Sequence, residues 1–405
     1  MSSWFENSFI KNVLTIAAGN TFAQAITVLI APILTRIYLP ADYGNYVLFT
    51  SVVSLICVFS AGSYERAIML PEDSKSANSL FGLSLLAHSG TTMIILIVLF
   101  AVWKMDTQVI QENQWLWIVP AGVFILGLVR IFGYFLSRIQ KFKEITTMQM
   151  IQSILSSGIQ ITAGLLYSLG SLGLIIGNVI GSLVAVVGVS CHANKIMDWK
   201  NRVSDFRLKA QLDVAKRYKK FPKYNIFSDI LNSSSSMLPL LLLGYYYNPV
   251  IVGWFALGQR VLALPMGLIG NSIAQVYFPK AVGERREGIA GKGMLRLFKT
   301  LLSLSLVPMV LLMIIGPELF SFVFGSKWVT AGTYVSYLGP WMLMVFVVSP
   351  LAVLFDVYER QRELLFFNIL LFTTRLFVLV VGGKTGSALE TVLVLGLTGV
   401  VLYLG

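Results

Sequence analysis

The sequence predicts an all-α integral membrane protein with about twelve transmembrane helices, six on each side of a polar linker. The composition, the spacing of the apolar stretches and the positions of the basic residues support this fold class. Of the 405 residues, 56% are hydrophobic and 12% are charged, whereas a soluble globular protein carries about 25% charged residues. A chain this apolar cannot cover a water-facing surface, so we expect much of its outer wall to face lipid.

The apolar stretches have the length of membrane spans. A transmembrane helix needs roughly 20 mainly apolar residues, because the hydrocarbon core is about 30 Å thick and each residue rises about 1.5 Å. The predicted spans lie near residues 12–36, 45–64, 79–102, 115–136, 146–168, 171–192, 224–246, 249–275, 296–315, 331–354, 364–381 and 386–404. The first is interpreted as a retained helix. The connection at 165–175 is only a few residues of Tyr, Ser and Gly, which leaves the count open by one.

The basic residues predict the orientation of the chain. Of the 31 Lys and Arg residues, 24 lie in the N-terminal tail and in the connections after even-numbered spans. Only Lys104, Lys327 and Lys384 follow odd-numbered spans. Positive charge marks the cytoplasmic side, so both termini are predicted to be cytoplasmic. The net charge of +12 is then a topology signal and an attraction to anionic headgroups of the lipid bilayer. No nucleic-acid partner is predicted.

The longest polar stretch divides the chain. We predict an N-terminal six-helix bundle at 1–192, a basic cytoplasmic linker at 193–223 and a C-terminal six-helix bundle at 224–405. Apolar residues at helical spacing in the linker, such as Leu208 and Val214, fit an interfacial amphipathic helix. A solvated linker fits them equally well.

A short internal match suggests that the two halves are parallel repeats. Pro40-Ala-Asp-Tyr-Gly44-Asn-Tyr46 and Pro249-Val-Ile-Val-Gly253-Trp-Phe255 are both Pro-x-x-x-Gly-x-aromatic, and each opens the second span of its half. Six spans per half would give both halves the same orientation, as in repeats related by an axis along the membrane normal.

Motifs of catalysis are absent from the sequence. There is no Gly-rich phosphate loop ending in Gly-Lys-Ser/Thr, no Gly-x-Ser-x-Gly elbow and no cluster with metal-ligand spacing. We therefore predict neither an enzyme nor a bound cofactor or metal. Cys57 and Cys191 are interpreted as structural thiols, and His88 and His192 as packed or interfacial side chains.

Arginines at membrane depth are the sharpest candidates for function. They are Arg36, Arg130, Arg260 and Arg375. A charge at the bilayer centre costs at least about 2.5–3.5 kcal/mol, and such residues usually face a bundle interior or a watery cavity. The competing interpretation is that each arginine reaches the headgroups or pairs with an acid.

Acidic partners for these arginines are scarce. Only Asp229 lies clearly within a span, and Glu65 and Asp356 lie at inner ends. We therefore expect a net positive interior, which would select an anion, because the guanidinium fork matches phosphate and carboxylate oxygens.

Two spans carry a polar face at i, i+4, i+7 spacing. The residues are Asn20, Gln24 and Thr27 in the first span and Asn225, Asp229 and Asn232 in the seventh. Hydrogen bonding between helices explains such faces, and so does a cleft lined by the first helix of each half. Asp229 is the first candidate for ion coupling.

Several stretches carry recognisable motifs. They are Asn12–Asn20, Ala31-Pro-Ile-Leu-Thr-Arg36 with the Asp42-Tyr-Gly44 turn that follows, Gly62-Ser-Tyr-Glu65-Arg66, and Gly253–Pro265 with Gln275–Pro279 after it. These stretches resemble bacterial polysaccharide repeat-unit flippases of the O-antigen and teichuronic-acid type. One departure is the end at Tyr403-Leu-Gly405, which is apolar and lacks a basic tail. Whether the last span is complete is therefore open.

The resemblance implies the fold of the multidrug/oligosaccharidyl-lipid/polysaccharide exporter superfamily, in which two six-helix bundles surround a central cleft. It implies an undecaprenyl-pyrophosphate-linked oligosaccharide as cargo, moved to the outer leaflet of the bacterial inner membrane by alternating access. A polysaccharide polymerase and a chain-length regulator are candidate partners, and lipopolysaccharide biosynthesis is the implied pathway. Arg36 and Arg260 match arginines in the family-like motifs, whereas Arg130 and Arg375 are candidates on physical grounds alone.

Three other functions compete with this one. A cation-coupled multidrug exporter of the same superfamily would favour embedded acids. A membrane polysaccharide polymerase or ligase would carry a large external loop, and the predicted external loops are short. A scaffold would not need buried charge.

Overall fold

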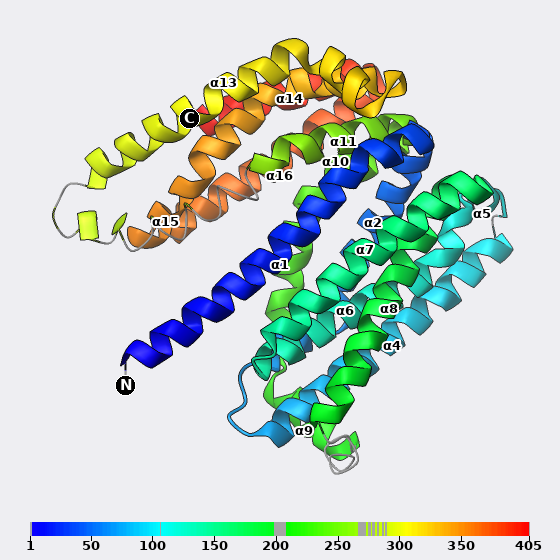
Figure 1. Cartoon of the computed structure of the whole chain (residues 1–405), viewed down its shortest axis with the longest axis vertical. Helices are drawn as coiled ribbons and strands as arrows, with labels where there is room; N and C mark the ends of the chain where they lie inside the picture. The colour runs from blue at the N-terminus through cyan, green and yellow to red at the C-terminus, as the bar shows by residue number, and fades with distance from the viewer. Residues whose placement is uncertain are drawn as a thin grey trace. The chain divides into compact units, whose positions relative to one another are not determined.

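The structure is a computed structural model that describes residues 2–105, 107–197, 208–265, 273, 277, 280–281, 283–285, 287 and 290–404. Within these ranges every regular element is a helix (Figure 1). The long helices are α1 (Ser2–Ile37), α2 (Pro40–Ser60), α4 (Ser74–Met105), α6 (Val119–Arg138), α7 (Phe142–Tyr167), α8 (Ser171–Met197), α10 (Ile226–Tyr246), α11 (Pro249–Pro265), α13 (Ala290–Phe324), α14 (Val329–Val348), α16 (Gln361–Thr385) and α17 (Ala388–Leu404). The shorter elements are α3 (Tyr64–Ala67), α5 (Thr107–Glu112), η1 (Gln114–Ile118), α9 (Leu208–Arg217), η3 (Phe221–Asn225), η5 (Ser326–Trp328), η6 (Ser349–Ala352) and α15 (Val353–Val357).

Within the described residues the predicted spans fall on these long helices, and residues 266–272, 274 and 275 of the predicted span 249–275 lie outside the described residues. The connection near 165–175 is confirmed as a break, because α7 ends at Tyr167 and α8 begins at Ser171, with positive φ at Ser168 and Gly170. Among the described residues, seven helical segments are long and apolar enough to cross a membrane. They are Pro40–Ser60, Ser74–Met105, Gln114–Arg138, Ser171–Cys191, Gly293–Phe324, Ser326–Phe355 and Arg362–Thr385. Shorter apolar helices cover Thr21–Ile37, Pro249–Leu264 and Ala388–Leu404. The all-helical membrane fold is confirmed, whereas the number twelve and the cytoplasmic termini stay predictions.

The chain forms two compact units whose boundaries cut through helices. Unit 1 comprises Met1–Tyr38 and Leu48–Met237, and unit 2 comprises Leu39–Val47 and Leu238–Gly405. The first turns of α2 therefore belong to the unit built from the C-terminal half. The first turns of α10 belong to the unit built from the N-terminal half. The domain boundaries inferred from the polar linker remain a prediction.

Unit 1 is built around α4, α6, α7 and α8. α7 packs along both α8 and α1, and α6 packs on α4 and α8. Phe81 and Phe135 belong to one buried cluster and pack with ring centroids 4.5 Å apart at a tilted interplanar angle of 46°. Val214 of α9 belongs to the same cluster, so the part of the predicted linker at 208–217 is an amphipathic helix seated on α4. Linker residues 198–207 lie outside the described residues.

Unit 2 is built around α14, which packs against α11, α13 and α17. Its largest fully buried side chains include Trp328 and Tyr334. Trp328 enters the core after a turn at Gly325, whose φ of 102° is open to glycine at little cost. The Nε1–H of Trp254 on α11 donates to the carbonyl of Lys327, 2.9 Å away, which ties that turn to α11.

The two motifs of the predicted repeat pack against each other within unit 2. A Cβ added at Gly44 would lie 1.7 Å from the carbonyl oxygen of Pro249, and one at Gly253 would lie 2.1 Å from the carbonyl oxygen of Pro40. Only glycine permits backbones this close. The contact is reciprocal, as expected of a two-fold relation between matching segments. This geometry supports the repeat and explains both glycines.

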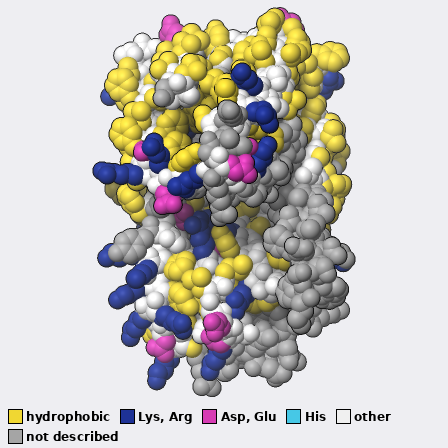
Figure 2. Space-filling view, turned by 90° about the vertical axis from the view of Figure 1, so that its left-hand side faces the viewer, with side chains coloured by type: hydrophobic (Ala, Val, Ile, Leu, Met, Phe, Trp, Pro, Cys, Tyr) yellow, Lys and Arg dark blue, Asp and Glu magenta, His cyan; other side chains and the backbone are white. Residues whose placement is uncertain are grey.

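The outer surface of the long helices is apolar. Met93 and Ile97 of α4 are 57% and 63% exposed, and Val307 and Ile314 of α13 are 64% and 69% exposed. Figure 2 shows broad hydrophobic patches on the face in view, beside separate groups of lysine and arginine. Side chains of this kind would be unfavourable in water and favourable against acyl chains, which agrees with a multi-pass membrane protein.

Candidate functional site

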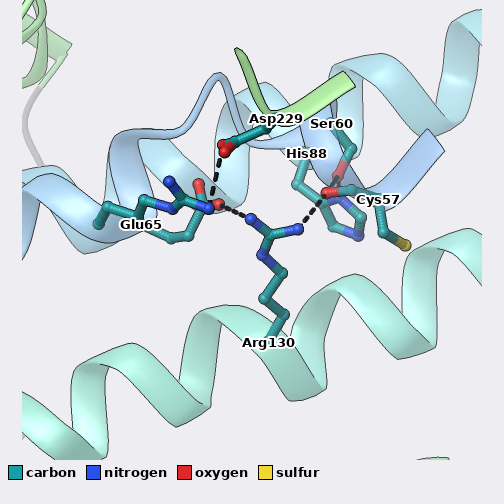
Figure 3. A network of polar contacts seen from close by, with 7 residues as sticks. Cys57, Ser60, Glu65, His88, Arg130 and Asp229 are labelled. Carbon is teal, nitrogen blue, oxygen red and sulfur yellow. Dashed lines mark hydrogen bonds and ion pairs between the residues drawn. The ribbon is translucent and has the colours of Figure 1, made fainter. Parts of the chain in front are cut away.

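Arg130 of α6 forms an ion pair with Glu65 of α3. Arg130 Nη2 lies 3.0 Å from Glu65 Oε1, and its Nη1–H donates to the carbonyl of Cys57 at 3.3 Å. The Glu65 side chain is 1% exposed and that of Arg130 is 26% exposed. Burial raises the pKa of the Glu65 carboxyl, and the Arg130 guanidinium offsets part of that rise. Figure 3 shows Arg130 pointing from its helix toward both partners.

A second ion pair lies beside the first. Arg66 Nη2 lies 3.1 Å from Asp229 Oδ2, and Tyr134 on α6 is close enough to Arg66 to interact with it electrostatically. Asp229 stands in the first turn of α10, in the part of that helix that belongs to unit 1. The two arginines and two acids carry two positive and two negative charges, so the cluster is neutral.

A sharp turn brings Glu65 into the interior. α2 ends at Ser60, and the next residues include Gly62 with φ 65° and Ser63 with φ 55°. A left-handed conformation is accessible to glycine but costs a serine free energy. The turn reverses the chain into α3, whose inner face carries Glu65 and Ala67.

His88 extends the polar network along α4. Its Nδ1 lies 2.8 Å from Ser60 Oγ, and its Nε2 lies 3.0 Å from the carbonyl of Phe124. Gly127 makes room for the ring, since a Cβ there would lie 2.0 Å from His88 Cε1. Figure 3 places His88 and Ser60 beside Cys57. The prediction that His88 is a packed, satisfied side chain is confirmed.

Arg260 of α11 has a different environment. Its Nη1–H donates to the hydroxyl of Tyr43 at 3.1 Å, and Tyr46 is also close enough to interact electrostatically. In the part of the chain that the structure describes, no carboxylate lies within ion-pair distance of Arg260. The side chain is partly buried. Its positive charge is therefore held by aromatic hydroxyls and not by an acid.

Arg375 of α16 also rests on aromatic side chains. Its guanidinium carbon lies 4.7 Å from the ring centroid of Trp341 on α14, and it interacts electrostatically with Tyr403 on α17. Trp341 is 3% exposed. α17 comes close to this ring at Gly399, where a Cβ would lie 2.4 Å from Trp341 Cγ. A cation over the face of a tryptophan is attracted by the ring quadrupole.

These arrangements were compared with known proteins. A family model described as "Polysaccharide biosynthesis protein" matches residues 33–332. The chain belongs to this polysaccharide biosynthesis family. The matched range contains Arg36, Arg130 and Arg260, and it ends before Arg375. A search among curated proteins found no match.

Solved structures share the fold of this polysaccharide biosynthesis protein. The lipid II flippase MurJ in an inward closed conformation is 13% identical, with 96% of this chain and 86% of that chain covered and a TM-score of 0.72. An inward-facing multidrug resistance MATE family transporter of the MOP superfamily is 14% identical, with coverage of 94% and 92% and a TM-score of 0.67. An outward-facing MATE structure is 14% identical, with coverage of 97% and 93% and a TM-score of 0.52. At these identities the likeness shows the fold alone.

The remaining candidate residues on α1 have different environments. Arg36 near the end of α1 is exposed, as is Gln24. Thr27 turns toward α7, where its hydroxyl lies 3.4 Å from Ser153 Oγ. The side chain of Asn20 lies outside the described residues. Of the residues on the predicted polar face, Thr27 therefore packs against α7, whereas Gln24 is exposed.

The candidates at the start of the second half are also separated. Asn225 is partly buried in η3, and Asn232 is exposed on α10. Asp229 faces Arg66 in unit 1. Substrate binding by the two asparagines and ion coupling by Asp229 stay predictions.

Sequence reasoning missed the partners of the arginines. The sequence places Glu65 at the inner end of a predicted span, so the count of charges inside the membrane does not include it. The expected net positive interior is therefore wrong for the neutral cluster of unit 1. Glu65 and Arg130 are 65 positions apart, and no periodicity links them. The only local signal was the Gly62-Ser63 turn, which precedes an acid in an otherwise apolar stretch.

Proposed function

We propose that this protein translocates an undecaprenyl-pyrophosphate-linked oligosaccharide from the cytoplasmic to the outer leaflet by alternating access. The cargo would be an O-antigen or other polysaccharide repeat unit, and the site of action the bacterial inner membrane. The protein would act as a transporter and not as an enzyme. Membership of the polysaccharide biosynthesis family supports the glycan, and the fold shared with a lipid II flippase supports the translocation.

The observation that carries this proposal is the environment of Arg260. A guanidinium in an apolar helix, held by a tyrosine and with no acid at ion-pair distance among the described side chains, keeps its positive charge available. Pyrophosphate offers several charged oxygens, which the planar fork of arginine binds bidentately. Arg375 of α16 and Arg36 of α1 are proposed as further substrate-binding residues.

Polar side chains would meet the sugars. Gln24 and Asn232 are exposed, and amide groups both donate and accept hydrogen bonds, as sugar hydroxyls require. Asn225 and Asn20 are proposed for the same role, and Asp229 for coupling to an ion. Arg130 is a weaker candidate for direct binding, because Glu65 already balances its charge.

The test is a translocation assay in proteoliposomes with a fluorescent undecaprenyl-pyrophosphate oligosaccharide. We expect wild-type protein to move the cargo, Arg260→Ala to lose at least about tenfold in rate, equivalent to about 1.4 kcal/mol, and Arg260→Lys to fall between. Lys104→Ala, an exposed cation at the end of α4, is the matched control and should match wild type. Full activity of both Arg260 variants would remove that residue from the mechanism.

A multidrug exporter is the second candidate, because MATE transporters share the fold. The same proteoliposomes loaded with a lipophilic cationic dye distinguish the two functions. Dye efflux without glycan translocation would favour the exporter and refute the flippase.

A further inference from the structure

Tyr43 is placed to do more than hold Arg260. A tyrosine hydroxyl accepts and donates at the same time. Its oxygen accepts an N–H of Arg260 at 3.1 Å, so its own O–H still needs an acceptor. Among the described residues no acceptor for that proton is found within hydrogen-bond distance. Arg260, with five N–H donors, makes this one hydrogen bond in the same part of the structure.

The ring of Tyr43 is fixed on several sides. Its centroid lies 5.7 Å from that of Trp328 at an interplanar angle of 86°, an edge-to-face contact. Tyr46 packs against it with centroids 6.1 Å apart. Tyr43 is 6% exposed and Trp328 is fully buried. The hydroxyl therefore cannot leave Arg260 without displacing a packed ring.

The backbone that carries Tyr43 is equally fixed. Gly44, the next residue, lies in the reciprocal contact with Gly253, seven residues before Arg260 on α11. The carboxylate of Asp42 accepts the N–H of Leu39 at 3.1 Å, which caps the start of α2. The segment Leu39–Val47 belongs to unit 2 together with α11. Tyr43 and Arg260 are therefore presented by one rigid contact, although they are 217 positions apart.

We propose that Tyr43 is itself a substrate-binding residue that forms, with Arg260, the site for a phosphate group of the lipid carrier. Arg260 donates from its free N–H groups to one phosphate oxygen, and the Tyr43 O–H donates to another. A neutral donor beside the cation adds a hydrogen bond without a second buried charge. This inference rests on the proposed function, since the phosphate is that of the proposed cargo.

The alternative is that Tyr43 only positions the guanidinium. The two roles differ in a double-mutant cycle. If Tyr43 only positions Arg260, removing its hydroxyl has no effect once Arg260 is Ala. If the hydroxyl donates to the phosphate, its removal still weakens binding in that background.

The experiment measures binding of undecaprenyl pyrophosphate to the purified full chain in detergent for wild type, Tyr43→Phe, Arg260→Ala and the double variant. Tyr43→Phe keeps the ring and its packing, so the fold should be retained, as checked by the midpoint of thermal unfolding. We expect Tyr43→Phe to weaken binding about tenfold, about 1.4 kcal/mol, and to weaken it by at least about threefold in the Arg260→Ala background. Tyr38→Phe is the matched control, because the buried Tyr38 hydroxyl donates to the carbonyl of Gln160 at 2.6 Å and should leave binding unchanged.

Wild-type affinity in Tyr43→Phe, or no effect of that change in the Arg260→Ala background, would overturn the inference. Failure of this inference can be distinguished from failure of the proposed function. Loss of undecaprenyl pyrophosphate binding in Tyr43→Phe, with no translocation of glycan by wild type, would refute the flippase and keep the phosphate site. Translocation by wild type with unchanged binding in Tyr43→Phe would keep the flippase and refute the phosphate site.

Discussion

The deep arginines of the two units are stabilised in different ways. In unit 1, Arg130 meets the carboxylate of Glu65 at 3.0 Å, and Arg66 meets that of Asp229 at 3.1 Å. In unit 2, Arg260 meets the hydroxyl of Tyr43 and Arg375 lies over the ring of Trp341. Arg130 and Arg66 are therefore neutralised by acids, whereas no carboxylate among the described residues lies within ion-pair distance of Arg260.

This difference distinguishes arginines that stabilise the fold through ion pairs from an arginine that is proposed to bind an anion. A buried ion pair needs both partners, because removing one leaves an uncompensated ion in a low dielectric. An arginine held by aromatic groups keeps a field that attracts an anion, and the cost of burying it is recovered when the anion binds. We therefore propose Arg260, and not the unit 1 cluster, as the main anion-binding residue, and regard that cluster as a neutral structural link between α3, α6 and α10.

The largest effect on stability is expected at the Glu65–Arg130 pair. Arg130→Met leaves a carboxylate that is 1% exposed without its counter-ion, which should destabilise the fold by about 3–5 kcal/mol. The double variant Arg130→Met with Glu65→Leu should recover most of that loss. The measurement is the midpoint of thermal unfolding of purified protein in detergent. If Arg130→Met is as stable as wild type, the ion pair does not stabilise unit 1, and the proposed difference between the two units is refuted.

The next effect concerns the contact that presents Tyr43 to Arg260. Gly44→Ala adds a Cβ 1.7 Å from the Pro249 carbonyl oxygen, and backbone atoms have little freedom to yield, so we expect a loss of about 1–3 kcal/mol. Gly90→Ala on α4 is the control, because nothing lies within 4 Å of its added Cβ. Equal midpoints of thermal unfolding for both variants would contradict the close crossing.

A smaller stability effect is expected at Arg260 itself. Arg260→Met removes one hydrogen bond to Tyr43 and no ion pair among the described residues, so the loss should be about 0.5–1.5 kcal/mol. It should therefore stay below that of Arg130→Met in the same thermal unfolding experiment. The reverse order would show that Arg260 has a structural role comparable to that of Arg130.

The smallest effect on stability is expected at Asp73, which belongs neither to the ion-pair cluster of unit 1 nor to the Tyr43–Arg260 contact. The N–H of Ser76 donates to Asp73 Oδ2 at 2.7 Å at the start of α4, which lowers the pKa of this exposed carboxyl. A lowered pKa contributes stability that is present above the ordinary aspartate pKa and lost as the pH falls through the folded value. Thermal unfolding of Asp73→Ala should differ slightly from wild type near neutral pH, and the difference should vanish in acid. A difference that grows in acid would contradict this assignment.

The sequence predicted the fold well, because composition and helix length are local properties. The break after Tyr167 and the glycines of the repeat could be predicted from short windows, whereas in the stretch containing Val214 an amphipathic helix and a solvated linker fitted the sequence equally well. The partners of the arginines could not, since Tyr43 and Arg260 are 217 positions apart and are joined only by the Gly44–Gly253 contact. Sequence reasoning identified which arginines are deep, but it could not show which ones are neutralised.

The most direct test compares translocation by two variants that each remove one deep arginine. One is Arg260→Met, and the other is the neutral double variant Arg130→Met with Glu65→Leu. With the fluorescent undecaprenyl-pyrophosphate oligosaccharide in proteoliposomes, we predict that the double variant keeps a rate within about twofold of wild type and that Arg260→Met loses at least about tenfold. An active Arg260→Met protein beside an inactive, folded double variant would contradict the assignment of anion binding to Arg260.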